Sequence, residues 1–298
     1  MAGATLGARE NAPSVRVKIE LRYDGTDFSG WAAQPGRRTV EGVLAETLSR
    51  VLRLPVFGQA EPPRLTVAGR TDAGVHARAQ AVHADIPAAA WAAGADTVSR
   101  RLTRALPPDI RVRSVGLAPD GFDARFSALW RRYSYRVCDD PAAADPLRRH
   151  DTLWHFRALD LDAMNTAAAR LVGEHDFAAF CRRREGATTV RALRRLDWAR
   201  DADGVAVACV IADAFCHNMV RSLIGALLAV GEGGRPPSWP ASVLAAAVRD
   251  PAVRVVSPHG LCLEEVRYPE PAGLAERAAQ TRRLRTLEAG LCGRHRSG

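Results

Sequence analysis

The chain has 298 residues, a length that allows two modest domains, each large enough to bury its own core. Lys and Arg number 42 against 33 Asp and Glu, and the formal net charge of +9 favours nucleic acid over an acidic protein as a partner. The N-terminus has no apolar core of signal-peptide length, and no stretch has the roughly 20 apolar residues that span a bilayer. These features predict a cytoplasmic protein with no membrane partner.

Cysteine and histidine spacing gives no indication of a metal site. The histidines form no H-E-x-x-H or comparable ligand pattern, and the cysteines stand singly without a C-x-x-C pair. We therefore expect no metal, no zinc knuckle and no disulfide framework, and we expect reduced, mostly buried thiols. The cysteines are Cys138, Cys181, Cys209, Cys216, Cys262 and Cys292.

The first part of the chain predicts strands and helices in turn. Residues 15–23 alternate apolar and polar side chains, which is the period of a half-buried strand. Residues 39–54 place Thr39 as an N-cap before an apolar stripe and predict an amphipathic helix. The strand residues expected to face one core are Val15, Val17, Ile19 and Leu21. Further strands are expected at 65–69, 80–86 and 110–117, and a helix at 96–106.

The second part of the chain begins a similar order again. An Asp203–Gly204 turn between two apolar runs within 194–212 predicts a β-hairpin. Strands in hairpin-like pairs fit two α+β halves with antiparallel sheets better than alternating βαβ units. The other expected elements are strands at 131–138 and 261–267 and helices at 161–173 and 217–231.

Composition suggests where the domains and loops lie. The Pro-rich stretches 139–146 and 233–240 are expected to be loops, and 272–291 is either a basic helix or a loose tail. The expected organisation is a disordered N-terminal extension at 1–14, an N-terminal α+β domain at 15–124, a C-terminal α+β domain at 125–268 and a basic C-terminal tail at 269–298.

One short stretch between two expected strands concentrates charged residues. The sequence AGRTDAGVHARAQ, residues 68–80, places Asp72 before a small-residue turn, with Arg70 and Arg78 close by. A lone aspartate in such a loop is most often a turn former or a cap, and the arginines would then be ordinary surface charge. The rest of the chain favours a functional aspartate, because this motif does not stand alone.

Six motifs occur in a defined order along the chain. They are YDGTDFSGW (23–31), AGRTDAGVHA (68–77), RFSALWRRYSYRV (125–137), GEHDFAAF (173–180), MVRSLIGALLAVGEG (219–233) and GLCLEEVRY (260–268). Bacterial tRNA pseudouridine synthases carry the same motifs in the same order. From about residue 15 to residue 268 the chain closely resembles the tRNA pseudouridine synthase A family.

The resemblance implies a function and a fold. The implied activity is a cofactor-free conversion of uridine to pseudouridine at positions 38, 39 and 40 in the anticodon stem-loop of tRNA, carried out by a homodimer. The implied fold is α+β, with two RRM-like or ferredoxin-like halves whose antiparallel sheets form a pseudouridine synthase fold with a central basic cleft. The predicted order of strands and helices agrees with this fold.

The resemblance also implies four site residues. Asp72 matches the catalytic aspartate, and Arg221 matches the arginine that pairs with it; the alternative is an arginine snorkelling from an apolar helix. Tyr133 matches the tyrosine that lies against the target base, but a core aromatic is possible, and Tyr135 faces the same side of the strand. Arg70 matches the arginine that helps to extrude the nucleotide, unless it forms a structural salt bridge with Asp72.

The chemistry explains why these residue types are suitable. Uridine must be detached at N1, turned over and rejoined through C5, so the enzyme needs a group that holds the fragment without letting water capture it. Asp72 must be ionised to do so, and a cationic neighbour favours and orients a carboxylate.

Two alternative functions are an RNA-binding or RNA-folding protein and a base-excising hydrolase. Simple binding to RNA phosphates does not require Asp72, Tyr133 and Arg221 in this arrangement. These matched residues therefore argue against a protein that binds or folds RNA without turnover. A base-excising hydrolase with an acidic nucleophile lacks a clear second carboxylate for water activation.

Some residues depart from the family pattern or stay outside the expected site. The family commonly has glutamine after the Gly-Trp pair, whereas this chain has Ala32 and Ala33 there. After Phe215 the family pattern leads us to expect a hydrophobic residue and then variable positions, whereas this chain has Cys216 and His217. None of these replaces a matched site residue. The histidines expected to be structural hydrogen-bonding residues are His76, His83 and His175.

Overall fold

The computed structural model describes residues 13–54, 62–182 and 188–282. Residues 14–117 contain β1 (Ser14–Tyr23), α1 (Val40–Leu52), β2 (Thr66–Val67), β3 (His76–Pro87), α2 (Ala88–Ala105) and β4 (Ile110–Leu117). Residues 130–282 contain β5 (Trp130–Cys138), β6 (Leu153–Trp154), α3 (Leu161–Ala169), β7 (Gly173–Asp176), β8 (Val190–Arg200), β9 (Ala206–Ala212), α4 (Met219–Gly231), α5 (Trp239–Ala246), β10 (Leu261–Arg267) and α6 (Leu274–Arg282).

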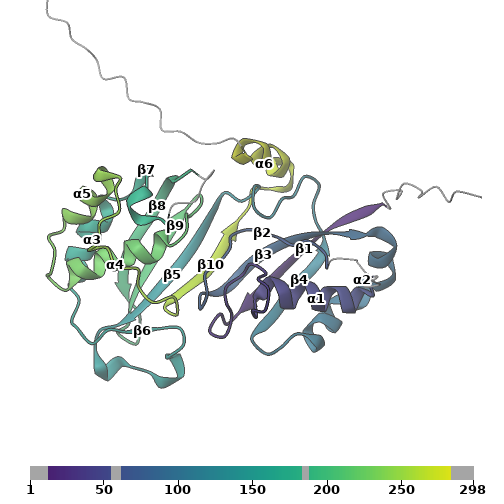
Figure 1. The fold of residues 1–298 in the computed structure, drawn as a ribbon, viewed down its shortest axis with the longest axis horizontal. Coiled ribbons are helices and arrows are strands. Elements are labelled where there is room, and N and C mark those ends of the chain that lie inside the picture. Colours follow the sequence, from purple (N-terminus) through teal and green to yellow (C-terminus); the bar gives the residue numbers. More distant parts are fainter. Residues whose placement is uncertain (1–12, 55–61, 183–187, 283–298) are drawn as a thin grey trace, which may run out of the picture.

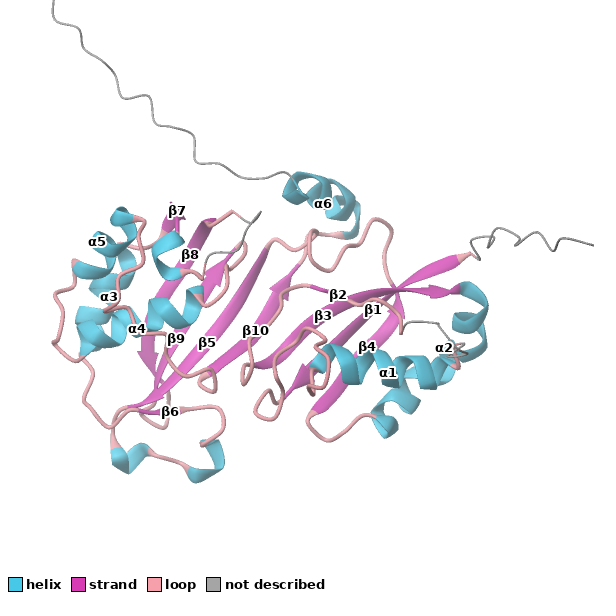
Figure 2. Ribbon diagram, in the orientation of Figure 1, coloured by secondary structure: helices cyan, strands magenta, loops and turns pink. Residues whose placement is uncertain are grey.

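The described strands form one mixed sheet that runs the length of the molecule (Figure 1). Its strand order is β4-β1-β3-β10-β5-β9-β8-β7, with β2 paired to β3 and β6 paired to β5. Helices α1 and α2 lie at the β4 end of the sheet, and α3, α4 and α5 lie at the β7 end (Figure 2). None of the helices in the described ranges is long and apolar enough to cross a membrane.

The first strand and helix form as their sequences predict. Val17, Ile19 and Leu21 of β1 are fully buried, because alternate side chains of a strand point to the same face. The Thr39 hydroxyl accepts a hydrogen bond from the Gly42 N–H and caps α1, as expected.

The middle of the sheet differs from the purely antiparallel pairing that was expected. Pairing is antiparallel within 14–117, but β10 runs parallel to β3, with Cys262 opposite His76 and Leu263 opposite Ala77. On its other side β10 pairs antiparallel with β5. The last strand therefore pairs with the parts of β3 and β5 that β2 and β6 leave unpaired, which sequence periodicity cannot reveal.

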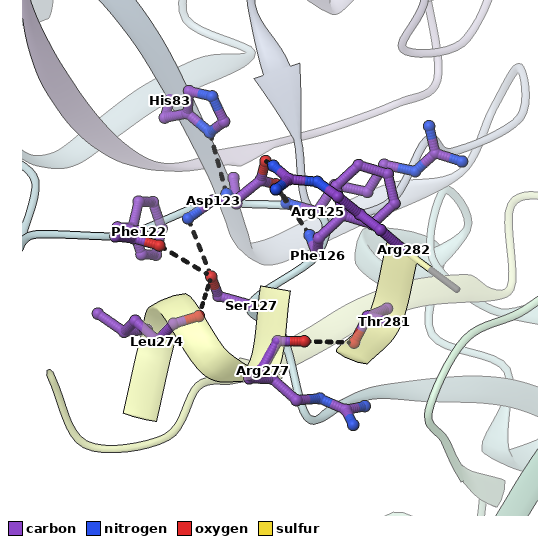
Figure 3. A network of polar contacts seen from close by, with 12 residues as sticks. His83, Phe122, Asp123, Arg125, Phe126, Ser127, Leu274, Arg277, Thr281 and Arg282 are labelled. Carbon is purple, nitrogen blue, oxygen red and sulfur yellow. Dashed lines mark hydrogen bonds and ion pairs between the residues drawn. The ribbon is translucent and has the colours of Figure 1, made fainter. Parts of the chain in front are cut away.

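The segment between β4 and β5 is held by α6 (Figure 3). The Asp123 carboxylate accepts hydrogen bonds from two backbone N–H groups that follow it in the chain, and it forms an ion pair with Arg282 at 3.0 Å. The Ser127 hydroxyl donates to the Leu274 carbonyl at 3.0 Å. The stretch 272–291 is thus helical and docked as far as Arg282, and 283–298 lie outside the described residues.

Several element boundaries differ from the predictions. Helix α2 begins at Ala88 rather than at 96, because its alanine-rich first turns carry no amphipathic pattern. Strand β3 begins at His76 rather than at 80, and β6, β7 and α5 were not expected. The expected loop at 139–146 contains the short 3-10 helix Pro141–Ala143, and a second one starts at Pro146. Strand β1 starts at Ser14, inside the expected disordered extension, of which 1–12 are not described.

Candidate active site

Asp72 lies in the loop between β2 and β3, as predicted. The Val75 N–H donates to the Asp72 carbonyl at 3.2 Å and closes a turn, and the Trp31 N–H donates to the Thr71 carbonyl at 3.0 Å. The Tyr23 and Thr71 hydroxyls are 2.8 Å apart, in hydrogen-bonding contact. Backbone and side-chain contacts therefore fix the residue immediately before the aspartate.

Two glycines allow the segment 23–31 to pack against this loop. Gly30 has φ +93°, and a Cβ atom there would lie 2.9 Å from the Thr71 carbonyl oxygen. A Cβ atom at Gly25 would overlap the Val75 carbonyl. The motif YDGTDFSGW thus supports the aspartate loop through backbone contacts that a larger residue would block.

Arg221 of α4 meets Asp72 although the two residues are 149 positions apart. Its Nη1 lies 3.4 Å from Asp72 Oδ2, and its Nε donates to the Val256 carbonyl at 2.7 Å. The arginine side chain is 17% exposed and the aspartate 30%. Arg221 therefore reaches inward to the carboxylate rather than snorkelling to water.

The loop that contains Val256 lies close to α4 at Gly225. A Cβ atom there would overlap the Arg254 carbonyl oxygen, so only glycine permits this approach. The same approach brings the Val256 carbonyl to Arg221, which fixes the guanidinium beside Asp72.

Tyr133 of β5 is buried beside this ion pair. Its ring meets the Phe215 ring edge to face, with centroids 5.1 Å apart. Burial raises the pKa of Tyr133 well above its ordinary value, and the nearby Asp72 carboxylate acts in the same direction. The phenol is therefore neutral. Tyr135, the residue most easily confused with it, donates its hydroxyl to the Ser257 carbonyl and is fully buried.

Arg70 is exposed on the same loop as Asp72. Within the described ranges it forms no ion pair, so the alternative of a structural salt bridge to Asp72 finds no support there. The structure brings Asp72, Arg221 and Tyr133 together and leaves Arg70 at the surface of the loop.

The three histidines expected to be structural make hydrogen bonds to the backbone. His76 Nδ1 accepts from the Gly25 N–H, and its Nε2 lies 2.7 Å from the His150 carbonyl. His83 Nδ1 accepts from the Ala124 N–H, and burial lowers the pKa of this histidine, which keeps the ring neutral. His175 Nε2 contacts the backbone at 3.3 Å. The expectation that these three histidines form hydrogen bonds is confirmed.

Arg131 was not singled out from the sequence. It is buried on β5, two residues before Tyr133, and donates to the carbonyls of Ala68 and Asp213. Burial lowers its pKa. Its forked guanidinium joins the strand of Tyr133 to the chain leading into the Asp72 loop, which spacing alone does not predict.

His217 was also missed as a neighbour of the aspartate. Its Nε2 lies 3.3 Å from Asp72 Oδ1, while Arg221 faces the other oxygen. The expected helix 217–231 begins only at Met219, and Asn218 before it has φ +66°, so helical spacing from Arg221 could not have indicated this contact.

The cysteine prediction was wrong for one pair. Cys181 and Cys216 form a disulfide with a Cα–Cα distance of 5.8 Å, whereas Cys138, Cys209 and Cys262 are free. The two partners are 35 residues apart and belong to no C-x-x-C motif. Only the tertiary fold brings them together.

Comparison with known proteins gives the family. Residues 167–269 match a family model described as tRNA pseudouridine synthase. The tRNA pseudouridine synthase A of Streptomyces griseus is 61% identical over 280 residues, covering 93% of this chain and 97% of that protein. The chain belongs to the tRNA pseudouridine synthase A family. It is therefore a pseudouridine synthase, an isomerase.

Other matches agree to different extents. The tRNA pseudouridine synthase A of Mycobacterium leprae is 47% identical over 284 residues, covering 91% of this chain and 96% of that protein. Among solved structures, a chain of a Cbf5-Nop10-Gar1 complex matches at 12% sequence identity and a TM-score of 0.31. The match covers 72% of this chain and 54% of that chain. That structural likeness is too low to carry an argument.

Proposed function

We propose that this pseudouridine synthase acts on tRNA, at positions 38, 39 and 40 of the anticodon stem-loop, with Asp72 as its catalytic group. The observation that carries the proposal is the carboxylate of Asp72, partly exposed, with Arg221 at 3.4 Å and the buried Tyr133 nearby. A carboxylate oriented by an arginine and next to an aromatic ring suits chemistry on an extruded uridine.

The reaction assigns a distinct part to each residue. Asp72 holds or stabilises the fragment while the base is detached at N1, turned over and rejoined through C5. Arg221 orients the carboxylate through its contact with Oδ2. Tyr133 stacks on the base as a neutral phenol, because its pKa is raised.

Arg70 belongs to this proposal as the residue that replaces the flipped nucleotide. Extruding a base from a stacked stem leaves a gap, and a long cationic side chain can occupy it. The exposure of Arg70 leaves its guanidinium available to RNA.

The proposed enzyme binds tRNA in a cleft between its two halves and works as a homodimer. Two RRM-like halves, 15–124 and 125–268, would form a basic cleft for one tRNA that touches both subunits of a homodimer. The net charge of +9 supports binding to a polyanion. Such an enzyme would act in the cytoplasm.

Asp72→Asn tests the catalytic assignment. The variant keeps size and polarity but loses the charge, so pseudouridine formation on unmodified tRNA should fall below detection while tRNA affinity is retained. The measurement pairs single-turnover pseudouridine mapping with binding on the same purified protein. Substantial activity would reduce Asp72 to a turn former, for which asparagine is an adequate substitute. Release of free uracil by the wild type would instead identify a hydrolase.

A further inference from the structure

We propose that His217 is a positioning residue that holds one oxygen of Asp72 while Arg221 holds the other. His217 Nε2 lies 3.3 Å from Oδ1, and Arg221 Nη1 lies 3.4 Å from Oδ2. The inference rests on the proposed role of Asp72. It assigns a function to a residue outside the four site residues that the family resemblance implies.

Contacts to both carboxylate oxygens of Asp72 restrict its rotation more than a contact to one oxygen does. The terminal torsion of an aspartate is broad, so a carboxylate held through a single oxygen turns easily about its Cβ–Cγ bond. Donors on different oxygens fix the plane of the group. Fixing that plane aims the carboxylate at one place in the site, and small errors of orientation are costly in catalysis.

The backbone of His217 is itself held in place. Its carbonyl accepts a hydrogen bond from the Arg182 N–H at 2.9 Å, and the preceding Cys216 is bonded to Cys181. Two consecutive residues of one segment are thus tied to two consecutive residues of another. These contacts fix the position from which the His217 side chain reaches Asp72.

The same short segment also contacts the tyrosine. Phe215, two residues before His217, packs edge to face on the ring of Tyr133. The segment 215–217 therefore touches both the carboxylate and the aromatic residue of the site. The imidazole Nε2 is the ring nitrogen that faces Asp72 Oδ1, so it is the atom that would donate to the carboxylate.

The imidazole is 42% exposed, which also suits a direct contact with an RNA phosphate. The two roles differ in what they affect. A positioning residue changes the rate of the bound complex, whereas a phosphate contact changes tRNA affinity and its salt dependence.

The test compares His217→Phe with His217→Gln in single-turnover pseudouridine formation on unmodified tRNA. Phenylalanine keeps a ring and removes the donor, so the rate constant should fall roughly 10- to 100-fold with unchanged tRNA affinity. Glutamine retains an N–H donor and should recover most of the rate. His175→Phe is the matched control; it makes the same change on β7 and should keep the wild-type rate.

The outcomes separate this inference from the proposed function. Wild-type rates in His217→Phe, with an inactive Asp72→Asn, overturn the positioning role and leave the catalytic aspartate in place. Weaker tRNA binding at an unchanged rate constant makes His217 an RNA contact and also overturns it. Equal losses in the Phe and Gln variants do the same, because the donor would then be irrelevant. An active Asp72→Asn removes the basis of both ideas.

Discussion

At the scale of single residues, Tyr133 combines a hydrophobic environment with a polar tip. Its ring is buried against Phe215, and its hydroxyl lies near Gly69, since a Cβ atom at that glycine would be 3.9 Å away. Because burial raises its pKa, the phenol stays protonated in the pH range of ordinary assays. The ring and the hydroxyl can therefore be tested separately.

We expect Tyr133→Phe to bind tRNA but to turn over poorly, because the variant keeps the aromatic face and loses only the hydroxyl. Tyr133→Leu should also lose about 1–3 kcal/mol of binding free energy, the contribution of one stacked base. Equilibrium binding and single-turnover kinetics on both variants check this. Near-normal activity in both variants would remove Tyr133 from the site. Tyr135→Phe is the control, because it removes a hydroxyl whose hydrogen bond to the Ser257 carbonyl is structural.

At the scale of elements, α4 positions Arg221 because a loop packs closely against it. The Val256 carbonyl reaches the Arg221 Nε only where Gly225 leaves room for the chain at Arg254. A packing detail half-way along the helix thus controls the orientation of the guanidinium near its start.

Gly225→Ala should destabilise the protein by about 1–3 kcal/mol, because the added methyl overlaps a backbone oxygen that cannot easily move. We also expect a lower rate constant, since Arg221 would lose its carbonyl partner. Urea unfolding and single-turnover kinetics measure the two effects. Gly116→Ala is the matched control, because a Cβ atom on that β4 residue meets nothing within 4 Å. Equal stability in the two variants would contradict the close approach.

The disulfide joins Cys181, which follows the 3-10 helix Ala178–Phe180, to Cys216 in the segment that enters α4. Closing a loop of this length stabilises the native state by about 3–4 kcal/mol in the chain-entropy view. We expect alkylation without reduction, followed by peptide mapping, to find Cys181 linked to Cys216, and reduction to lower the free energy of unfolding. In Cys216→Ser, reduction should have no such effect. Recovery of both cysteines as alkylated thiols from the unreduced protein would rule the bond out.

At the scale of the whole molecule, the sheet makes two parts of the chain into one body. β10 lies between β3 and β5, so the loop that carries Asp72 and the strand that carries Tyr133 are anchored in the same sheet. Helix α6 adds a second connection through Asp123 and Ser127 (Figure 3). A site made from distant segments therefore has a common rigid support.

The net charge of +9 leads to a prediction about tRNA binding. Each cation that neutralises a phosphate releases a counterion, so log affinity should fall steeply and linearly with log salt concentration. Binding titrations across a salt series measure the slope, and Asp72→Asn should show the same slope as the wild type. A flat response would contradict the electrostatic account of binding.

The sequence by itself determined the local elements and the family. The two-residue period of β1, the N-cap Thr39 and the turn at Asp203–Gly204 are short-range features, and short-range sterics and hydrogen bonds decide them. The motif around Asp72 predicted a functional loop between strands, and its position is confirmed. Residue roles came only from resemblance to the family.

Tertiary structure alone decided which distant groups meet. Nothing in the local pattern of β10 says that it runs parallel to β3, because a strand's period is the same beside any neighbour. The Cys181–Cys216 bond and the contact of His217 with Asp72 depend on where the chain returns after 35 and 145 residues, respectively. Such contacts form because burying the whole core places these segments side by side, and burial is a property of the entire chain.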